Sequence, residues 1–145
     1  MAGHPEGSEL RELSVEECWD LVETRSVGRF AACRIGAGPL VLPVNYVIAD
    51  DRSRVVFRSG PGAKLKAVGN GLSVIQVDEI DPLHHTGWSV VIEGTTSWHY
   101  EGPESTVVET WAPGPKPYVV SMQPTGITGR RIHLPQPETD ERGYR

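Results

Sequence analysis

The sequence contains few cysteines, and their spacing excludes a disulfide framework or a zinc centre as the basis of the fold. Cys18 and Cys33 are the only cysteines among 145 residues. Neither has another cysteine or a histidine at the spacing of zinc ligands, so no metal site is expected. Both lie in apolar patterns, one helical and one strand-like, where small buried thiols are common. A disulfide between them is not expected in a reducing cytoplasm.

Long apolar runs and basic tracts are also missing. No apolar stretch approaches the roughly 20 residues that a helix needs to cross a bilayer, which argues against a membrane protein. The formal net charge is −5 and no basic tract offsets it, which argues against nucleic acid or an anionic membrane as a partner. The first residues have neither a basic region nor an apolar core, so a cytoplasmic location is expected instead of secretion.

The residues that are present predict one mainly-β domain, over 13–134, between flexible tails at 1–12 and 135–145. Ser14 and Glu17 fit a capping box, and the apolar residues that follow repeat with helical spacing. Six main strands are then expected, at 29–35, 40–48, 55–57, 72–78, 88–100 and 118–122, with a short further one at 127–132. Short helices are expected at 63–68 and 103–111. Without βαβ alternation, an antiparallel barrel with helical covers fits best, and Gly94 predicts a kink in its longest strand.

Two of the three lysines follow a glycine-rich turn that separates a strand pattern from a helix pattern. Gly60, Pro61 and Gly62 break the strand and permit backbone torsions that other residues resist. Free N–H groups at the helix start, with three polar side chains nearby, would suit a dianionic phosphate: Arg58, Ser59 and Lys64. The alternative is an ordinary strand-to-helix turn whose basic residues face water, as is predicted for Lys66.

Other polar residues leave alternatives open. Pro43 cannot donate to a sheet ladder, so it marks a bulge or an edge. Asn45 lies in an otherwise apolar strand and either bonds nearby backbone or faces a ligand. His84 and His85 are predicted to lie in a surface loop, with a role at a pocket mouth or as a haem ligand as the alternative. No serine has a nucleophile-elbow pattern, and no catalytic acid, base or nucleophile is predicted.

The order of these segments resembles the pyridoxamine 5′-phosphate oxidase-like, FMN-binding split-barrel family, over about 13–132. The resemblance rests on 27–31 (VGRFA), 42–46 (LPVNY), 57–65 (FRS through KL), 88–94 (WSVVIEG) and the closing TGRR at 128–131. The short length and leading helix are most similar to the small actinobacterial and nitroimidazole-resistance-type branches.

The resemblance implies a six-stranded antiparallel split barrel with an N-terminal helix and short covering helices. It further implies a homodimer with two flavin sites at the subunit interface. Pro43, Val44 and Asn45 would then lie along the flavin ring, and Arg58, Ser59 and Lys64 would hold its phosphate. Gln76 would lie near the polar edge of the ring, and Trp88 and Ser89 would approach from the neighbouring strand or subunit.

The substrate-binding arginine and histidine of true pyridoxamine phosphate oxidases have no convincing match, so vitamin B6 oxidation is not expected. A bound flavin would carry the redox chemistry itself. The favoured function is an FMN-dependent oxidoreductase that reduces a small electrophile such as a nitro compound or quinone. The alternatives are a deazaflavin (coenzyme F-420)-dependent reductase and a non-catalytic flavin- or haem-binding protein.

Overall fold

The structure is a computed structural model that describes residues 9–102 and 108–134. Its elements, in chain order, are β1 (Glu9–Glu12), α1 (Val15–Val22), β2 (Val27–Ala32), β3 (Leu40–Ala49), β4 (Arg54–Ser59), α2 (Ala63–Lys66), β5 (Leu72–Asp81), β6 (Thr86–Tyr100) and β7 (Tyr118–His133). All strand pairings are antiparallel. The strands follow the order β1-β7-β4-β3-β2-β5-β6, and β6 also pairs with β7. That last pairing closes six strands into the predicted barrel, with β1 added to the edge of β7.

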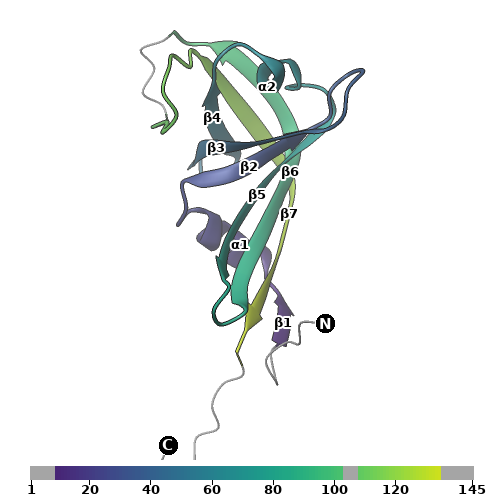
Figure 1. Cartoon of the computed structure of the whole chain (residues 1–145), viewed down its shortest axis with the longest axis vertical. Coiled ribbons are helices and arrows are strands. Elements are labelled where there is room, and N and C mark those ends of the chain that lie inside the picture. Colours follow the sequence, from purple (N-terminus) through teal and green to yellow (C-terminus); the bar gives the residue numbers. More distant parts are fainter. Residues whose placement is uncertain (1–8, 103–107, 135–145) are drawn as a thin grey trace, which may run out of the picture.

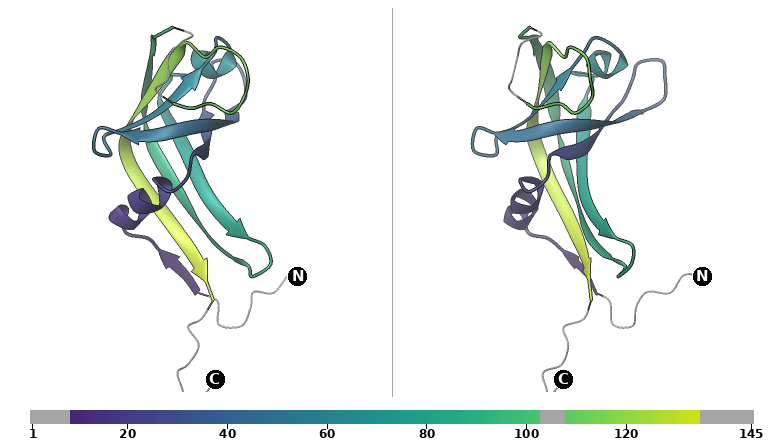
Figure 2. Two further views of the ribbon diagram at one scale, coloured as in Figure 1. Left: turned by 90° about the vertical axis from the view of Figure 1, so that its left-hand side faces the viewer. Right: turned by 60° about the vertical axis from the view of Figure 1, so that its left-hand side comes forward.

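The barrel lies at one end of an elongated molecule (Figure 1). The long strands β5, β6 and β7 continue beyond it as a sheet extension, and α1 packs on one face of that extension (Figure 2). We call the side facing the barrel interior and α1 the inner face, and the opposite side the outer face. Alternation along β6 places Val90 and Ile92 on the inner face, where both are fully buried. The core inside the barrel includes Phe30 and Phe57, whose ring centroids lie 4.9 Å apart.

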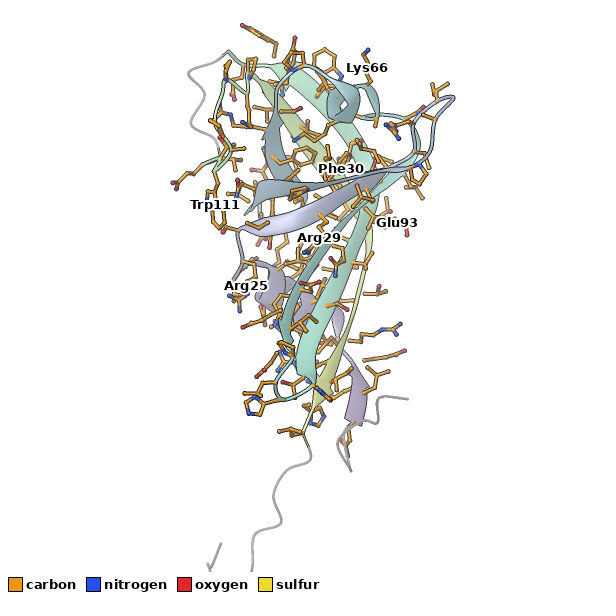
Figure 3. The ribbon with its side chains drawn as sticks, viewed as in Figure 1. Arg25, Arg29, Phe30, Lys66, Glu93 and Trp111 are labelled. Atoms are coloured by element: carbon orange, nitrogen blue, oxygen red, sulfur yellow. The ribbon has the colours of Figure 1, made fainter. Side chains whose placement is uncertain are left out.

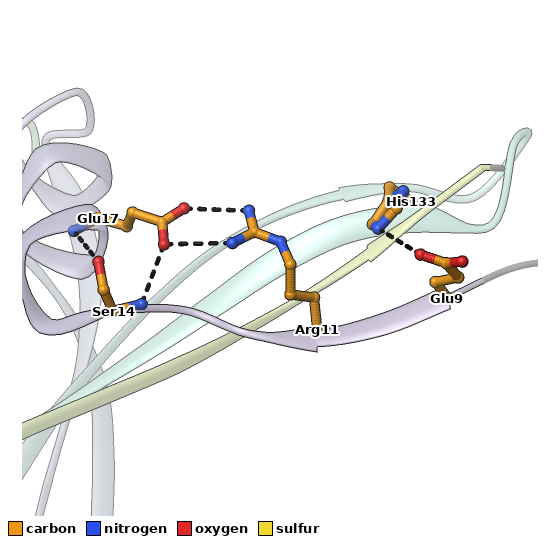
Figure 4. Close-up of polar contacts among 5 residues, drawn as sticks. All are labelled: Glu9, Arg11, Ser14, Glu17 and His133. Atoms are coloured by element: carbon orange, nitrogen blue, oxygen red, sulfur yellow. Dashed lines mark hydrogen bonds and ion pairs between the residues drawn. The ribbon is translucent and has the colours of Figure 1, made fainter. Parts of the chain in front are cut away.

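The N-terminal helix has the predicted capping box. The backbone N–H of Glu17 donates to Oγ of Ser14 at 3.1 Å, and the backbone N–H of Ser14 donates to Oε1 of Glu17 at 3.1 Å. Arg11 of β1 adds two hydrogen bonds to the same carboxylate (Figure 4). These contacts lower the pKa of Glu17 to about 2, with the Arg11 side-chain hydrogen bond as the largest cause. No helix within the described ranges has the length and apolarity needed to cross a bilayer.

Several local predictions differ from the structure. Residues 9–12, predicted as part of a flexible tail, form β1 because they pair with the end of β7, a contact that local sequence does not reveal. The two predicted last strands are one continuous strand, β7. Cys33 is exposed because β2 ends at Ala32, whereas Cys18 is buried as predicted, and both thiols are free. The predicted helix at 103–111 falls partly outside the described residues, and 108–111 are not helical.

Two predictions about strand geometry are confirmed. The register between β6 and β7 shifts between Glu93 and Gly94, where the kink is predicted. Pro43 lies in β3 opposite Arg29 of β2, whereas β3 pairs with β4 only from Tyr46 onward. Pro43 therefore lies on a stretch of β3 that has one edge free of a ladder partner, as its missing N–H requires.

Candidate functional site

The turn between β4 and α2 lies beside two cationic side chains, those of Arg58 and Lys64. Arg58 is the second-to-last residue of β4 and lies on the outer face, where its Nε donates to the carbonyl of Lys116 at 3.0 Å and its Nη1 to that of Val108 at 3.3 Å. Lys64 is half-buried on α2, with its Nζ 5.8 Å from the centroid of the Phe57 ring. Neither cation forms an ion pair with a carboxylate within the described ranges. This unbalanced positive charge beside a glycine turn favours an anion.

The electrostatics of Lys64 agree with that interpretation. Burial lowers the pKa of Lys64, and the positive charge of Lys116 lowers it further. A bound anion would relieve both effects because it would supply the opposite charge that this ammonium group lacks. Lys66, on the same short helix, is exposed and points away from the barrel (Figure 3). The solvated role predicted for Lys66 is therefore confirmed.

Ser59 does not point toward Arg58. Its side chain faces the barrel interior, is 1% exposed, and donates a hydrogen bond to the carbonyl of Gly60 at 2.6 Å. Of the three residues predicted to hold phosphate, Arg58 and Lys64 offer charge at the turn. Ser59 lies at the same turn with its hydroxyl already engaged.

Segment 108–117 is the part of this site that sequence reasoning missed. Nζ of Lys116 donates to the carbonyls of Ala112 and Pro113, at 3.0 and 3.1 Å, which folds the segment into a compact loop. The carbonyl of Pro115 lies close enough to Gly60 that an added Cβ there would approach it to 3.4 Å. The scarcity of lysine was a signal for Lys116, but its place beside Lys64 depends on long-range packing.

Asn45 lies next to Arg58 on the outer face. Tyr46 pairs with Phe57 at the end of the β3–β4 ladder, and Asn45 and Arg58 are the residues directly beyond that pair on the two strands. Oδ1 of Asn45 accepts a hydrogen bond from the backbone N–H of Trp111 at 2.8 Å, and its Nδ2 donates to the carbonyl of Ser26 at 3.3 Å. The structure thus brings together Asn45 and Arg58, which are predicted for the ring and the phosphate. Both side chains form hydrogen bonds with segment 108–117, whose Trp111 is labelled in Figure 3.

The other predicted ring contacts form a row across the barrel wall. Pro43 is in register with Arg29, which is in register with Gln76. Nε2 of Gln76 donates to Asp78 at 2.9 Å, and Nη1 of Arg29 lies 3.8 Å from the same carboxylate. Val44, between Pro43 and Asn45, points into the core and is 5% exposed, so only its backbone faces outward. Sequence reasoning missed Arg29. Because neighbouring side chains in a strand point to opposite faces, an inward-facing Phe30 would have placed Arg29 on the outer face.

Trp88 and Ser89 lie at the far end of β6 and face opposite ways. Trp88 is 6% exposed on the inner face, whereas Ser89 faces outward and borders a pocket of about 500 Å³ with Ile80, Arg130 and Ile132. Ser59 is in register with Tyr118, which is in register with Tyr100, eleven residues after Ser89 on β6. At about 3.3 Å per residue, that separation is about 35 Å along the strand. Along β6, Ser89 is therefore far from the cationic turn but only two residues from Val91, which pairs with Gln76.

His84 and His85 are exposed on the loop between β5 and β6, which confirms the surface-loop prediction. Each also borders a pocket there: His85 the pocket beside Ser89, and His84 a pocket on the other side of the extension. Nδ1 of His84 lies 2.6 Å from Oδ2 of Asp81, and this hydrogen bond is the main cause of the lowered pKa of Asp81. In the described part of the chain, no group of three or more histidine, cysteine, aspartate or glutamate residues could hold a metal ion.

Residues 14–131 match the pyridoxamine 5′-phosphate oxidase family, which covers most of the 145-residue chain. The chain belongs to this family. An uncharacterized protein of Mycobacterium tuberculosis is 28% identical over an alignment 133 residues long that covers 86% of each chain.

Among solved structures, an FAD-binding protein from Mycobacterium smegmatis is similar, with 28% identity and a TM-score of 0.64. It covers 86% of this chain and 100% of its own. A Bacteroides thetaiotaomicron protein named for 5-nitroimidazole antibiotic resistance shares the fold, with 12% identity and a TM-score of 0.61. That match covers 91% of this chain and 96% of the other. The predicted resemblance to the pyridoxamine 5′-phosphate oxidase-like split barrels is therefore confirmed.

Membership in the pyridoxamine 5′-phosphate oxidase family explains why the polar residues gather where they do. The closed barrel supplies a rigid wall for Pro43, Arg29 and Gln76, while β4 and α2 present Arg58 and Lys64 beside the wall. The arrangement contains hydrogen-bond donors and cations but no nucleophile held by a base. Its chemical capacity is to bind and orient an anionic, planar group.

Proposed function

We propose that this protein binds FMN and acts as an oxidoreductase that reduces a small electrophilic substrate such as a nitro compound or a quinone. The observation that carries this proposal is the positive charge of Arg58 and Lys64 at the glycine turn, close to Asn45 on the barrel wall. Neither cation has a carboxylate partner among the described residues. The FAD-binding relative and the relative named for nitroimidazole resistance support a flavin cofactor and a nitro substrate. Deazaflavin coenzyme F-420 and haem remain the competing ligands in the test below.

The residues present suit the two ends of a flavin nucleotide. Arg58 and Lys64 would hold the phosphate, and Pro43, Asn45, Gln76 and the backbone of Val44 would lie along the ring. A bound flavin supplies two-electron transfer, and the protein supplies orientation and exclusion of water. Asn45 would exchange its hydrogen bond from Trp111 for one to the ring edge, so segment 108–117 would adjust when the cofactor binds.

We also propose a homodimer, in which the partner chain completes each site with Ser89. Ser89 lies about 35 Å from the cationic turn along the bent strand β6, which favours an approach of Ser89 to the phosphate end from a second copy. An apolar row on the outer face fits such an interface: Val41, Ala31 and Val74 are in register across three strands. Val41 is 59% exposed in the single chain, which favours its burial against another molecule. Trp88, on the inner face, keeps a packing role.

The first test is a titration of the ligand-stripped protein with FMN, FAD, coenzyme F-420 and haem, followed by absorption and fluorescence. We expect saturable quenching of FMN fluorescence, and then NAD(P)H-dependent reduction of a nitroaromatic or quinone by the loaded protein. If the protein preferentially binds the deazaflavin or haem, that ligand and not FMN is the cofactor. Flavin binding without turnover of any substrate class would make the protein a carrier, and no binding would overturn the proposal.

Mixed dimers test the shared site. The variants Lys64→Ala and Ser89→Trp should each bind little FMN as homodimers, because every site then carries one defect. A mixed dimer contains one site with both defects and one with neither, so mixing the two variants should restore up to about half of the sites. If the mixture binds no more FMN than the separate variants, each site is built from a single chain.

The lowered pKa of Lys64 predicts a pH dependence of FMN affinity. The phosphate is a dianion above about pH 7, and it requires the charged form of Lys64. Affinity should therefore hold at neutral pH and fall, by up to about tenfold per pH unit, once the pH passes the pKa of Lys64, which lies below its ordinary 10.5. In Lys64→Arg the charge persists, so the curve should stay flat in that range. Identical curves for the two proteins would remove Lys64 from the phosphate site.

A further inference from the structure

A second pocket lies on the inner face of the sheet extension, away from the cationic turn. It has a volume of about 710 Å³ and is bordered by the end of α1, the β5–β6 hairpin and the end of β7. Figure 2 shows these segments below the barrel, with α1 on one side of the extension. Small-molecule pockets in proteins typically measure about 300–1,000 Å³ and combine apolar walls with a few placed polar groups.

Most charged groups around this inner-face pocket already have partners. Three polar contacts surround it: the ion pair of Arg25 with Glu79, and the contacts of His84 with Asp81 and of His133 with Glu9, the last drawn in Figure 4. Arg25 balances the charge of Glu79, whereas each histidine balances its carboxylate only when its imidazole is protonated. The contacts also fix the rim, because the Arg25–Glu79 pair connects the loop after α1 to β5.

Arg131 is the exception. Its Nε atom is buried and lacks a hydrogen-bond partner, and Arg131 forms no ion pair within residues 9–102 and 108–134. Arg11 is in register with it on β1 but donates two hydrogen bonds to Glu17, at 3.2 and 3.0 Å. A buried guanidinium N–H without an acceptor is unfavourable. The terminal nitrogens of Arg131, which lines the pocket, also form no hydrogen bond within the described residues, and an anion in the pocket would supply acceptors to them.

The neighbours of Arg131 define the rest of the ligand. Trp88 is in register with Arg131 on β6, and Leu21 of α1 provides further apolar wall. Glu79 and Asp81 also line the pocket, and their carboxylates would oppose a dianion such as a phosphate more strongly than a monoanion. A carboxylate matches the planar fork of the guanidinium group, and a flat apolar body matches the walls.

We propose that the inner-face pocket binds a small planar aromatic carboxylate, with Arg131 holding the carboxylate and Trp88 and Leu21 packing against the ring. Arg131 and Ser89 face opposite sides of the extension, while Trp88 at the end of the hairpin borders the pockets on both sides. Arg131 is therefore not part of the proposed flavin site. The proposal does not rest on the flavin function and is tested in flavin-free protein.

The test is calorimetric titration of the full chain with benzoate, with benzamide as the uncharged isostere and phenylphosphate as the dianion. We expect saturable binding of benzoate, and binding at least about tenfold weaker for the other two probes. Arg131→Gln should weaken benzoate binding at least about tenfold. Arg130→Gln is the matched control, because the adjacent side chain faces outward, and it should change the affinity less than about twofold.

Further measurements separate ligand loss from unfolding. Arg131→Lys keeps the positive charge but loses the planar guanidinium group that can donate two hydrogen bonds to one carboxylate. This variant should stay folded and bind benzoate with an affinity between those of the wild type and Arg131→Gln. The indole N–H signal of Trp88 in an NMR spectrum, assigned with Trp88→Phe, should shift with benzoate in the wild-type protein. Equal loss in the two glutamine variants, equal affinity for benzoate and benzamide, or no saturable binding would overturn the proposal. FMN titration of Arg131→Gln should match the wild type, so failure here leaves the flavin site separately testable.

Discussion

Replacing Arg58 and Lys64 together with alanine should weaken FMN binding by about 100- to 10,000-fold. Each residue would make a charge-assisted hydrogen bond to the phosphate, worth about 1.5–3 kcal/mol, so the pair is worth about 3–6 kcal/mol. Each 1.4 kcal/mol corresponds to about a tenfold change in the dissociation constant. Fluorescence titration of the ligand-stripped proteins measures the loss directly.

Lys66→Ala is the matched control for this experiment. Lys66 lies on the same four-residue helix, α2, but is exposed and points away from the barrel, so its removal should change FMN affinity less than about twofold. Arg58 donates to two carbonyls of segment 108–117, so its loss should also lower stability by about 1–3 kcal/mol, which thermal unfolding would detect. If Lys64→Ala alone leaves affinity unchanged in a folded protein, the phosphate does not bind at this turn.

Gly94→Ala should destabilise the protein by about 3 kcal/mol or more, because this position has no room for a Cβ atom. A Cβ on Gly94 would lie 2.2 Å from the carbonyl oxygen of Gln123 and 2.8 Å from Cγ of Met122. The carbonyl belongs to the β7 backbone, so relief requires the two longest strands to separate at their register shift. For a chain of this size, the melting temperature should fall by roughly 6–12 °C.

Gly126→Ala provides the comparison within the same strand pair. Gly126 pairs with Glu93, next to the kink, yet an added Cβ there meets no atom within 4 Å. Its melting temperature should remain within about 4 °C of the wild type. Equal melting temperatures for the two alanine variants would mean that β6 and β7 can separate at the kink without cost, which would contradict the close contact.

Local sequence patterns predicted the parts of the fold that short-range physics controls. The capping box of Ser14 and Glu17 and the kink at Gly94 in the longest predicted strand both depend on residues close in the chain. The glycine turn with Arg58 and Lys64 was found for the same reason, because turn and helix-start signals are local. The family resemblance joined these segments into a barrel that the structure confirms.

Pairing between distant segments decided what local patterns could not. Strand β1 exists because residues 9–12 meet the end of β7, more than 100 residues later, and its four residues have no strong strand signal of their own. Likewise, Lys116 joins the cationic turn only because segment 108–117 folds back over Arg58 and Asn45.

The opposite orientations of Trp88 and Ser89 also combine a local property of the sequence with a result of tertiary packing. The sequence by itself determined that they are neighbours in a strand, and the alternation of strand side chains made opposite faces inevitable. Only the tertiary structure decided which face is which, because α1 covers one side of the extension and leaves the other open. Burial of Trp88 and exposure of the outer wall are consequences of that packing, since hydrophobic burial depends on what lies opposite a residue in space.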